Sequence, residues 1–419
     1  MRTCTPLALV ALLSGAAASA QSVSVPPSLE TLPGAVTTGG SLRDVAVWVN
    51  PADGGASLLF AGYSNTTQVG LVTFGVDGQQ VDQEGGSTLG VAVQDGFPLA
   101  GGSRTVVFTA DSTTGLMAYQ VDPQGADRVR QIGNGGFVTG TPYSSLAAYR
   151  SPSSGRYYLF AGTAGGGLQQ LELTGADGGV TATVARDLGD VGAGISGLVA
   201  DEETGYLFVV ETGQGLWRYA VEADGGTDRQ QVTSFPGGAL SLTVNRLALY
   251  RAANGEGYLL VANTGSNAFS VFERRSQAFI GSFNVTRDGG IDAVESPVAL
   301  AVTSRPVGPA FPDGLFVAHD SNDAPQNLKL VSWAAVANAF SPPLRIDTRQ
   351  ATDGGTDGGT DGGTDGGTGG GPVTPLPLPG NGGEDDEDEG RCSCSSASVP
   401  ASALLGLLAL VLGRRRRRS

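Results

Sequence analysis

Residues 205–219 read Gly-Tyr-Leu-Phe-Val-Val-Glu-Thr-Gly-Gln-Gly-Leu-Trp-Arg-Tyr. The stretch consists of an apolar run, a polar turn with two glycines, and a second run in which apolar and polar residues alternate. Glycine permits the positive φ angles of tight turns, and two such runs on either side of a turn are typical of a β-hairpin. The stretch therefore predicts two antiparallel strands.

The same hairpin pattern recurs along the chain. The small apolar residue that closes each first strand marks six copies, at Ala61, Ala110, Ala161, Val210, Ala262 and Ala318. Neighbouring markers lie 49, 51, 49, 52 and 56 residues apart. A further short apolar segment precedes each hairpin, at residues 45–49, 89–93, 146–149, 195–200, 244–250 and 298–303. Repeats of about 40–50 residues with several strands each are typical of propeller blades. The sequence therefore predicts an all-β, six-bladed β-propeller.

The composition agrees with a single ring of many short strands. The chain contains 66 glycines in 419 residues, as a fold with many tight turns requires. No long segment shows helical periodicity. Because the repeat is uninterrupted, we expect one toroidal domain over residues 41–347, preceded by a lead-in at residues 21–40.

Residues 1–20 have the pattern of a secretory signal peptide. Arg2 precedes an apolar run at residues 7–13, and Ala18-Ser19-Ala20 supplies small residues before Gln21. This arrangement predicts cleavage after Ala20 and export of the mature protein.

The segment at residues 348–390 differs sharply from the propeller. It contains Thr-Asp-Gly-Gly repeats, then a proline-rich stretch, and then an unbroken acidic run at residues 384–389. Repeated Asp-Gly also occurs in calcium-binding β-rolls, but here the apolar position on which such rolls stack is missing. The composition predicts a disordered linker.

The last region, residues 391–419, combines three features: Cys392 and Cys394, an apolar run at residues 399–412, and five arginines at residues 414–418. The run is short for a transmembrane helix, which needs about 20 residues, and arginines favour the cytoplasmic side. Two nearly adjacent cysteines do not suit a disulfide. The combination resembles the C-terminal sorting signals of myxobacterial surface proteins. This resemblance implies contact with the membrane before processing, recognition by export and sorting machinery, and a final location at the cell surface, on the outer membrane or outside the cell.

Charge excludes some function classes. The net charge is −15, with one lysine, Lys329, and one histidine, His319. Nucleic-acid binding needs a basic surface, so nucleic acid is a poor candidate partner. A zinc site of cysteine and histidine lacks ligands. His319 follows a strand at a predicted turn, where we expect it to be exposed.

Several motifs match one family. Residues 308–320 read Gly-Pro-Ala-Phe-Pro-Asp-Gly-Leu-Phe-Val-Ala-His-Asp, and Gln-Asn-Leu-Lys-Leu-Val follows at 326–331. Asp-Val-Ala-Val-Trp at 44–48 and Gly-Glu-Gly-Tyr-Leu-Leu at 255–260 match as well. From about residue 44 to residue 333 the chain resembles the secreted β-propeller phytases. The resemblance implies six blades, several calcium ions, and hydrolysis of phytate phosphomonoesters at the top of the ring. In such chemistry calcium neutralises the polyanionic substrate and polarises an attacking water.

The chain departs from the family motifs at the expected site. Where the family has Asn-Val-Asp-Xaa-Arg, residues 90–94 read Gly-Val-Ala-Val-Gln, and where it has Asp-Xaa-Glu-Gly, residues 243–246 read Thr-Val-Asn-Arg. The replaced acidic or basic positions are Ala92, Gln94, Thr163, Ser196, Thr243, Asn245, Val298 and Ala301. Calcium needs six to eight oxygen ligands, so these losses predict that a full calcium cluster does not form.

The remaining candidate residues form two sets. The resemblance implies one structural calcium near the loop at 320–327, with candidate ligands Asp44, Asp320, Asn322, Gln326 and Asn327. The second set offers possible ligand-binding groups: Asp111, Glu211, Asp292, Glu295 and Lys329. For Asp111 and Glu211, a solvated turn at a blade end is the alternative.

Two functions follow from these residues. The first is an active phytase that acts on phytate or another phosphomonoester, and the second is a surface propeller that binds a ligand or protein partner without hydrolysing it.

Overall fold

The computed structural model describes residues 20–32, 40–64, 69–176 and 178–348. The predicted processing residue Ala20 is exposed at the edge of this part. The rest of the signal peptide, the linker from residue 349 onward, and Cys392 and Cys394 in the predicted sorting signal lie outside the described residues. The described part belongs to one compact unit, Met1–Gly363, and the second unit, Thr364–Ser419, is not described.

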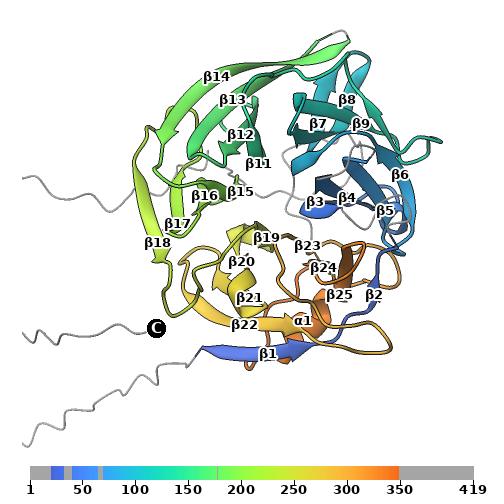
Figure 1. Cartoon of the computed structure of the whole chain (residues 1–419), viewed down its shortest axis with the longest axis vertical. Coiled ribbons are helices and arrows are strands. Elements are labelled where there is room, and N and C mark those ends of the chain that lie inside the picture. The colour runs from blue at the N-terminus through green and yellow to red at the C-terminus, as the bar shows by residue number, and fades with distance from the viewer. Residues whose placement is uncertain (1–19, 33–39, 65–68, 177, 349–419) are drawn as a thin grey trace, which may run out of the picture. The chain divides into compact units, whose positions relative to one another are not determined.

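Six sheets surround a central axis (Figure 1), and within each blade consecutive strands pair antiparallel. We number the blades in chain order. Blade 1 contains β3 (Ser41–Trp48), β4 (Leu58–Ser64), β5 (Leu71–Gly75) and β6 (Gln80–Glu84); blade 2 contains β7 (Thr88–Leu99), β8 (Gly102–Asp111), β9 (Gly115–Val121) and β10 (Val129–Gln131); blade 3 contains β11 (Tyr143–Arg150), β12 (Tyr157–Thr163), β13 (Gly167–Ala176) and β14 (Gly179–Asp190).

The other three blades follow the same order from the axis outward. Blade 4 contains β15 (Ile195–Asp201), β16 (Tyr206–Glu211), β17 (Gly215–Ala220) and β18 (Arg229–Ser234); blade 5 contains β19 (Leu247–Arg251), β20 (Gly257–Asn263), β21 (Ala268–Glu273) and β22 (Phe279–Val285); blade 6 contains β23 (Leu300–Thr303), β24 (Leu315–Asp320) and β25 (Asn327–Ser332). The all-β, six-bladed prediction is confirmed.

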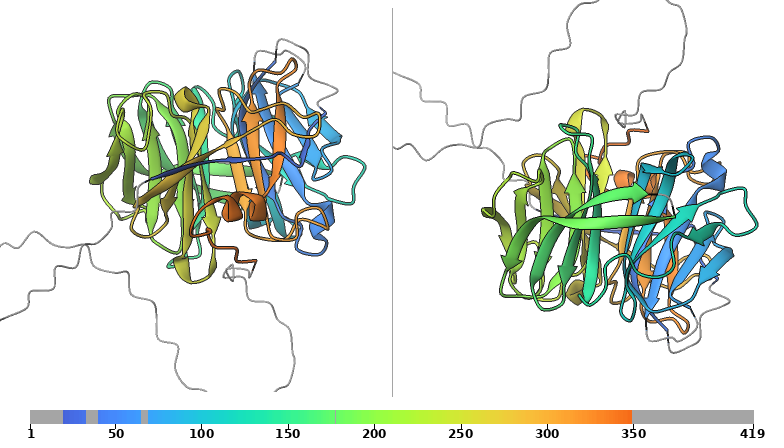
Figure 2. Two further views of the ribbon diagram at one scale, coloured as in Figure 1. Left: turned by 90° about the horizontal axis from the view of Figure 1, so that it is seen from below. Right: turned by 90° about the horizontal axis from the view of Figure 1, so that it is seen from above.

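The N-terminal segment completes the last two blades. Strand β1 (Gln21–Val25) lies parallel to β22, and β2 (Leu29–Glu30) pairs antiparallel with β25 as the fourth strand of blade 6. Gly281 permits the first pairing, because a Cβ there would lie 2.5 Å from the Gln21 carbonyl oxygen. Figure 2 shows β1 running across the outer edge of the ring. The two ends of the described chain therefore meet in blades 5 and 6.

Packing between blades makes the core. The second strand of each blade is mainly apolar and buried because neighbouring blades cover both of its faces, as in β4, where all seven residues are buried. The one α-helix among the described residues, α1 (Trp333–Ala339), packs beside blades 5 and 6, and Trp333 stacks on Tyr250 with ring centroids 4.1 Å apart. Three short 3₁₀ helices lie in loops: Gly54–Ala56, Ala253–Gly255 and Thr264–Ser266. No described helix has the length and apolar content needed to cross a membrane.

Candidate functional site

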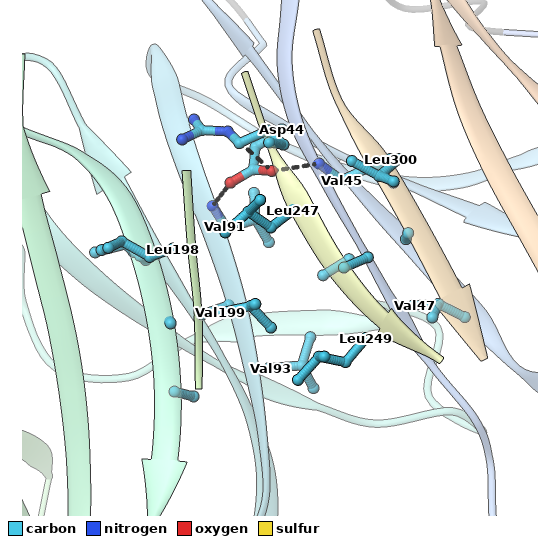
Figure 3. Close-up of a pocket in the computed structure, with 18 of the residues that line it drawn as sticks. Asp44, Val45, Val47, Val91, Val93, Leu198, Val199, Leu247, Leu249 and Leu300 are labelled. Atoms are coloured by element: carbon cyan, nitrogen blue, oxygen red, sulfur yellow. Dashed lines mark hydrogen bonds and ion pairs between the residues drawn. The ribbon is translucent and has the colours of Figure 1, made fainter. Parts of the chain in front are cut away.

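The first strands of the six blades line a central cavity of about 190 Å³ (Figure 3). Its wall consists mainly of valine, leucine and alanine side chains, and Asp44 is the one carboxylate among its described lining residues. Figure 3 shows Asp44 at one end of this set and Val47, Val93 and Leu249 toward the other. The other ionisable residues of the lining are Arg246 and Arg251, so the wall offers a single carboxylate to a multivalent cation.

Asp44 belongs to a buried polar group at the end of the cavity. Its two carboxylate oxygens accept hydrogen bonds from the Val45 and Val91 backbone N–H groups, each at 3.0 Å, and Oδ1 lies 3.2 Å from Nε of Arg246. Burial raises the pKa of Asp44, and the neighbouring Arg246 only partly opposes this. The Asp44 carboxylate is thus already paired with a cation of the protein itself, Arg246.

Arg246 lies just before β19 and is itself buried, at 9% exposed. Its guanidinium donates to oxygens of other blades: Nε to Arg43 O at 3.3 Å, Nη1 to Ser145 Oγ at 2.5 Å and Ser196 O at 2.7 Å, and Nη2 to Leu89 O at 2.5 Å and Ser144 O at 2.9 Å. We call Arg246, Asp44 and these five oxygens the hub.

A second buried cation, Lys329 on β25, lies near the ring closure. Its Nζ is 2.6 Å from Glu30 on β2, 2.6 Å from Asp292 in the loop after β22, and 2.8 Å from Asp323 in the loop after β24. A fourth carboxylate, Asp320, is 3.5 Å away. We call Lys329, these four carboxylates and the adjacent Asn327 the Lys329 cluster.

Ionisable groups of the Lys329 cluster have shifted pKa values, and the shifts differ in direction between its carboxylates. Burial alone would lower the pKa of Lys329, but the hydrogen bonds to Asp292, Asp323 and Glu30 raise it overall. Burial also opposes ionisation of Asp292, yet the bond to Lys329 holds the pKa of Asp292 below its ordinary value. The pKa of Asp320 is raised, because burial outweighs its backbone hydrogen bonds. One ammonium therefore faces four carboxylates.

Two buried oxygens in the Lys329 cluster accept no hydrogen bond: Oδ1 of Asn327, and Oδ2 of Asp320, whose ion-pair contact is Lys329 Nζ at 3.5 Å. Asp320 is fully buried and Asn327 is 8% exposed. The Asn327 amide meanwhile donates to Glu30 at 3.3 Å. Buried polar atoms are normally paired, so these two oxygens point to an additional ligand.

The donors of the Lys329 cluster fit calcium. Carboxylate oxygens of Glu30, Asp292 and Asp323 lie within 4.8 Å of one another, and Asp320 and Asn327 add further oxygens. Calcium takes six to eight oxygen ligands, with carboxylates and amide carbonyls among them, and it often keeps water. The hub fits calcium less well, because its six oxygens already surround a guanidinium.

The predicted metal ligands are thus distributed over different roles. Asp320 and Asn327 belong to the Lys329 cluster, whereas Asp44 belongs to the hub. The Gln326 side chain accepts from Leu42 N at 2.8 Å and donates to Ser321 O, and Asn322 is exposed. Glu295 is also exposed, and its backbone N–H donates to Asp320.

Asp111 and Glu211 end the second strands of blades 2 and 4. One Asp111 oxygen accepts from the N–H and hydroxyl groups of Thr113 and Thr114, and the other accepts from Ser87 N at 2.6 Å. Although burial opposes it, these bonds lower the pKa of Asp111. Glu211 pairs with Arg229, and burial raises the pKa of Glu211. Both side chains are buried, at 6% and 1% exposed, so neither lies in a solvated turn, and the contacts of both stay within their own blade.

The expectation that His319 is exposed was wrong. His319 is 1% exposed, because blades 6 and 1 close around the end of β24. Its Nδ1 accepts from Val298 N at 3.1 Å, and Nε2 lies 3.2 Å from Gln326 Oε1. Burial lowers its pKa to about 4, so the ring is neutral near pH 7.

Sequence reasoning missed three residues of these two groups: Glu30, Asp323 and Arg246. Glu30 lay in the segment expected to be a lead-in, and Asp323 was covered only by the range 320–327. Arg246 belongs to the motif at residues 243–246 that departs from the family pattern. This departure was the sign in the sequence that Arg246 has a different role.

Comparison with known proteins finds that the chain is similar to phytases. A family model described as Phytase matches residues 4–352. A 3-phytase of Bacillus subtilis (strain 168) is 28% identical over 308 residues, which are 70% of this chain and 80% of that protein. Among solved structures, a chain of the humanized mutant of the Chaetomium thermophilum Polycomb Repressive Complex 2 bound to the inhibitor GSK126 is 13% identical. Its TM-score is 0.36, and the match spans 56% of this chain and 47% of that chain. This last similarity is too low to support an argument.

Proposed function

The chain belongs to the phytase family, and we propose that it is an exported propeller of this family that binds calcium at the Lys329 cluster without hydrolysing phytate. In this proposal calcium is structural and holds the closing strand β2 to blade 6 through Glu30. The biological activity is then recognition of a ligand or protein partner at the cell surface.

One observation carries the non-hydrolytic part of the proposal. The end of the central cavity contains a guanidinium whose donors are bonded to six oxygens, and the cavity wall below it is mainly apolar. Stabilising a transferred phosphoryl group requires metal ions or free cationic donors directed at its oxygens. The bonded donors of Arg246 do not meet that requirement, and Arg251, the other cation of the cavity lining, is paired with the Ala200 carbonyl and Glu202.

The calcium part of the proposal rests on the Lys329 cluster. Glu30, Asp292, Asp320, Asp323 and Asn327 would supply the oxygens. Bound there, calcium would offset the excess negative charge. Lys329 would keep the carboxylates together before the ion binds and would retain its hydrogen bonds to some of them.

Phosphate release from calcium phytate tests the proposed function. The 3-phytase of Bacillus subtilis is the positive control, because it is a relative of the same family. We expect no release above background from this chain under conditions in which an enzyme turns over at about 1 s⁻¹ or faster. Turnover by this chain at such a rate would contradict the proposal.

Calcium-dependent hydrolysis is the second candidate function. The family match over residues 4–352 and the 28% identity to a 3-phytase favour it. If it holds, the substrate is phytate or another phosphomonoester, and phosphate release should disappear in a chelator. The same assay therefore separates the two candidates.

Export and anchoring form a separate part of the proposal. Residues 1–20 would direct secretion, and residues 391–419 would be recognised by membrane sorting machinery through Cys392 and Cys394. Replacing both cysteines with serine, or deleting residues 414–418, should release the protein from the surface. Cell fractionation measures this, and wild-type amounts of both variants at the surface would contradict the sorting role.

A further inference from the structure

We infer that the hub is a binding site for a planar guanidinium ion with a single positive charge, and that the protein fills this site with its own Arg246 side chain. Six oxygens from other segments lie 2.5–3.3 Å from guanidinium nitrogens. They are the carbonyl oxygens of Arg43, Leu89, Ser144 and Ser196, the Ser145 hydroxyl oxygen and Oδ1 of Asp44.

The six oxygens come from blades 1 to 4, and Arg246 comes from blade 5. The contact with blade 6 is made by the backbone, because Arg246 N–H donates to Val298 O at 3.3 Å, just before β23. All six blades therefore meet at one residue. A guanidinium has five N–H donors in a planar fork, and here each of its three nitrogens has an acceptor.

The charge of the hub explains why a monovalent cation suits it. Asp44 is the one carboxylate in the oxygen set, and the other five oxygens are neutral. A single positive charge balances this set, whereas a divalent ion would leave an excess positive charge in a buried place. The Lys329 cluster differs, because its four carboxylates leave an excess of negative charge around one ammonium.

Close backbone approach at the hub supports this inference independently. A Cβ on Gly197 would lie 2.6 Å from Asn245 O and 3.1 Å from Arg246 Cα, and a Cβ on Gly90 would lie 2.9 Å from Ser144 O. Glycine at both positions lets the blade backbones converge, so that their carbonyls point at a common centre. The hub contacts would hold the ring whether or not the protein hydrolyses phytate.

Chemical rescue tests the inference on the full chain in a calcium chelator, without substrate. Arg246→Ala should lower the Tm by about 10 °C, because it leaves Asp44 and the carbonyls buried without their cation. Adding 10 mM guanidinium chloride should then raise the Tm of the variant by about 3 °C or more, because the ion binds the folded state. This concentration is about a hundredfold below the molar range in which guanidinium unfolds proteins.

Arg251→Ala is the matched control. Arg251 also lines the cavity, but it donates to the Ala200 carbonyl and pairs with Glu202, both in blade 4, and its side chain is partly exposed to solvent. Neither this variant nor the wild type should respond to 10 mM guanidinium, and sodium chloride at the same concentration should leave all three proteins unchanged. Equal responses of Arg246→Ala and Arg251→Ala, or no response of Arg246→Ala, would overturn the inference.

Arg246→Lys decides the matter if Arg246→Ala does not fold. An ammonium has three donors on a flexible stem and cannot serve six oxygens from four blades. The Tm of Arg246→Lys should fall by several degrees in the chelator, and a Tm equal to that of the wild type would overturn the inference.

Discussion

The hub and the Lys329 cluster are two buried cations in very different surroundings. At the hub, Arg246 meets one carboxylate and five neutral oxygens, and each nitrogen is bonded. In the Lys329 cluster, one ammonium meets four carboxylates, and two oxygens remain without a hydrogen bond. The hub is balanced in charge, whereas the cluster is strongly negative.

Their access to solvent differs in the same direction. Arg246 and Asp44 side chains are 11% and 9% exposed, but Glu30, Asp292 and Asp323 are each about 30% exposed. The carboxylates of the Lys329 cluster are therefore more accessible to ions from solution than the side chains of the hub, which line the central cavity. The hub thus contains a cation of the protein itself, Arg246, whereas the Lys329 cluster offers partly exposed carboxylates to an ion from solution.

Among the variants that test this difference between the hub and the Lys329 cluster, Lys329→Met should have the largest effect on the free energy of unfolding. Removing the ammonium leaves four carboxylates together, and breaking a buried pair in this way costs about 3–5 kcal/mol of unfolding free energy. The loss should be seen in a chelator, and calcium should restore much of it by replacing the missing positive charge. Urea unfolding with and without calcium measures both.

Arg156→Met is the matched control for Lys329→Met. Arg156 pairs with Glu172 on the surface, with its side chain 62% exposed, so its loss should cost less than about 1 kcal/mol. If Lys329→Met were as stable as Arg156→Met in the chelator, the ammonium would not be holding the carboxylates together.

The second effect comes from buried His319 at the end of β24, whose pKa is lowered, whereas the pKa of Asp44 at the hub is raised. Buried His319 has a pKa of about 4, against 6.5 for a free histidine. Between these two pKa values the unfolded chain binds a proton at His319 and the folded chain does not. The contribution of neutral His319 to the free energy of unfolding is therefore complete above pH 6.5 and is lost as the pH falls toward 4. At about 1.36 kcal/mol per pKa unit the loss approaches about 3 kcal/mol.

His319→Asn isolates this contribution. The asparagine oxygen can still accept from Val298 N, but the side chain does not titrate. The difference in unfolding free energy between wild type and variant, measured by urea unfolding from pH 7.5 to pH 4.5, should change by most of that amount. A constant difference over this range would show that His319 is not the group responsible. Asp44 at the hub acts in the opposite sense, because its raised pKa makes the folded state favour its protonation as the pH falls.

The blades were predictable because their signal is local. Each hairpin carries its own apolar runs and turn glycines, so the period of about fifty residues appears in the sequence without knowledge of the fold. Ring closure has no such signal. β2 is two residues long, and its partner Leu330 lies at the other end of the domain; the pairing depends on the geometry of the complete ring.

The two cation groups were predictable only in part, for the same reason. Asp320, Asn327, Asp292 and Lys329 were found because they match or flank family motifs. Glu30 joins them only through ring closure. The hub ligands are mostly backbone carbonyls, which every residue carries, so no residue type could reveal them. His319 was wrongly expected to be exposed; its ring nitrogens contact Val298, just before β23, and Gln326, just before β25, and the sequence around the turn does not reveal that these segments enclose it.

The smallest effect, and the one that separates the two groups most cleanly, is the response to calcium. Calcium that binds only the folded state at one hundred times its Kd adds about 2.7 kcal/mol to the unfolding free energy. Glu30→Gln should remove most of this gain, because it takes a carboxylate from the Lys329 cluster. Asp44→Asn should lower the baseline but keep the gain, because Asp44 belongs to the hub. Thermal melts with a chelator and with calcium measure the gain, and titration calorimetry should find about one calcium per chain. An equal loss of the gain in both variants, or three or more tight sites, would mean that calcium also binds at the hub and that the two regions do not differ in this way.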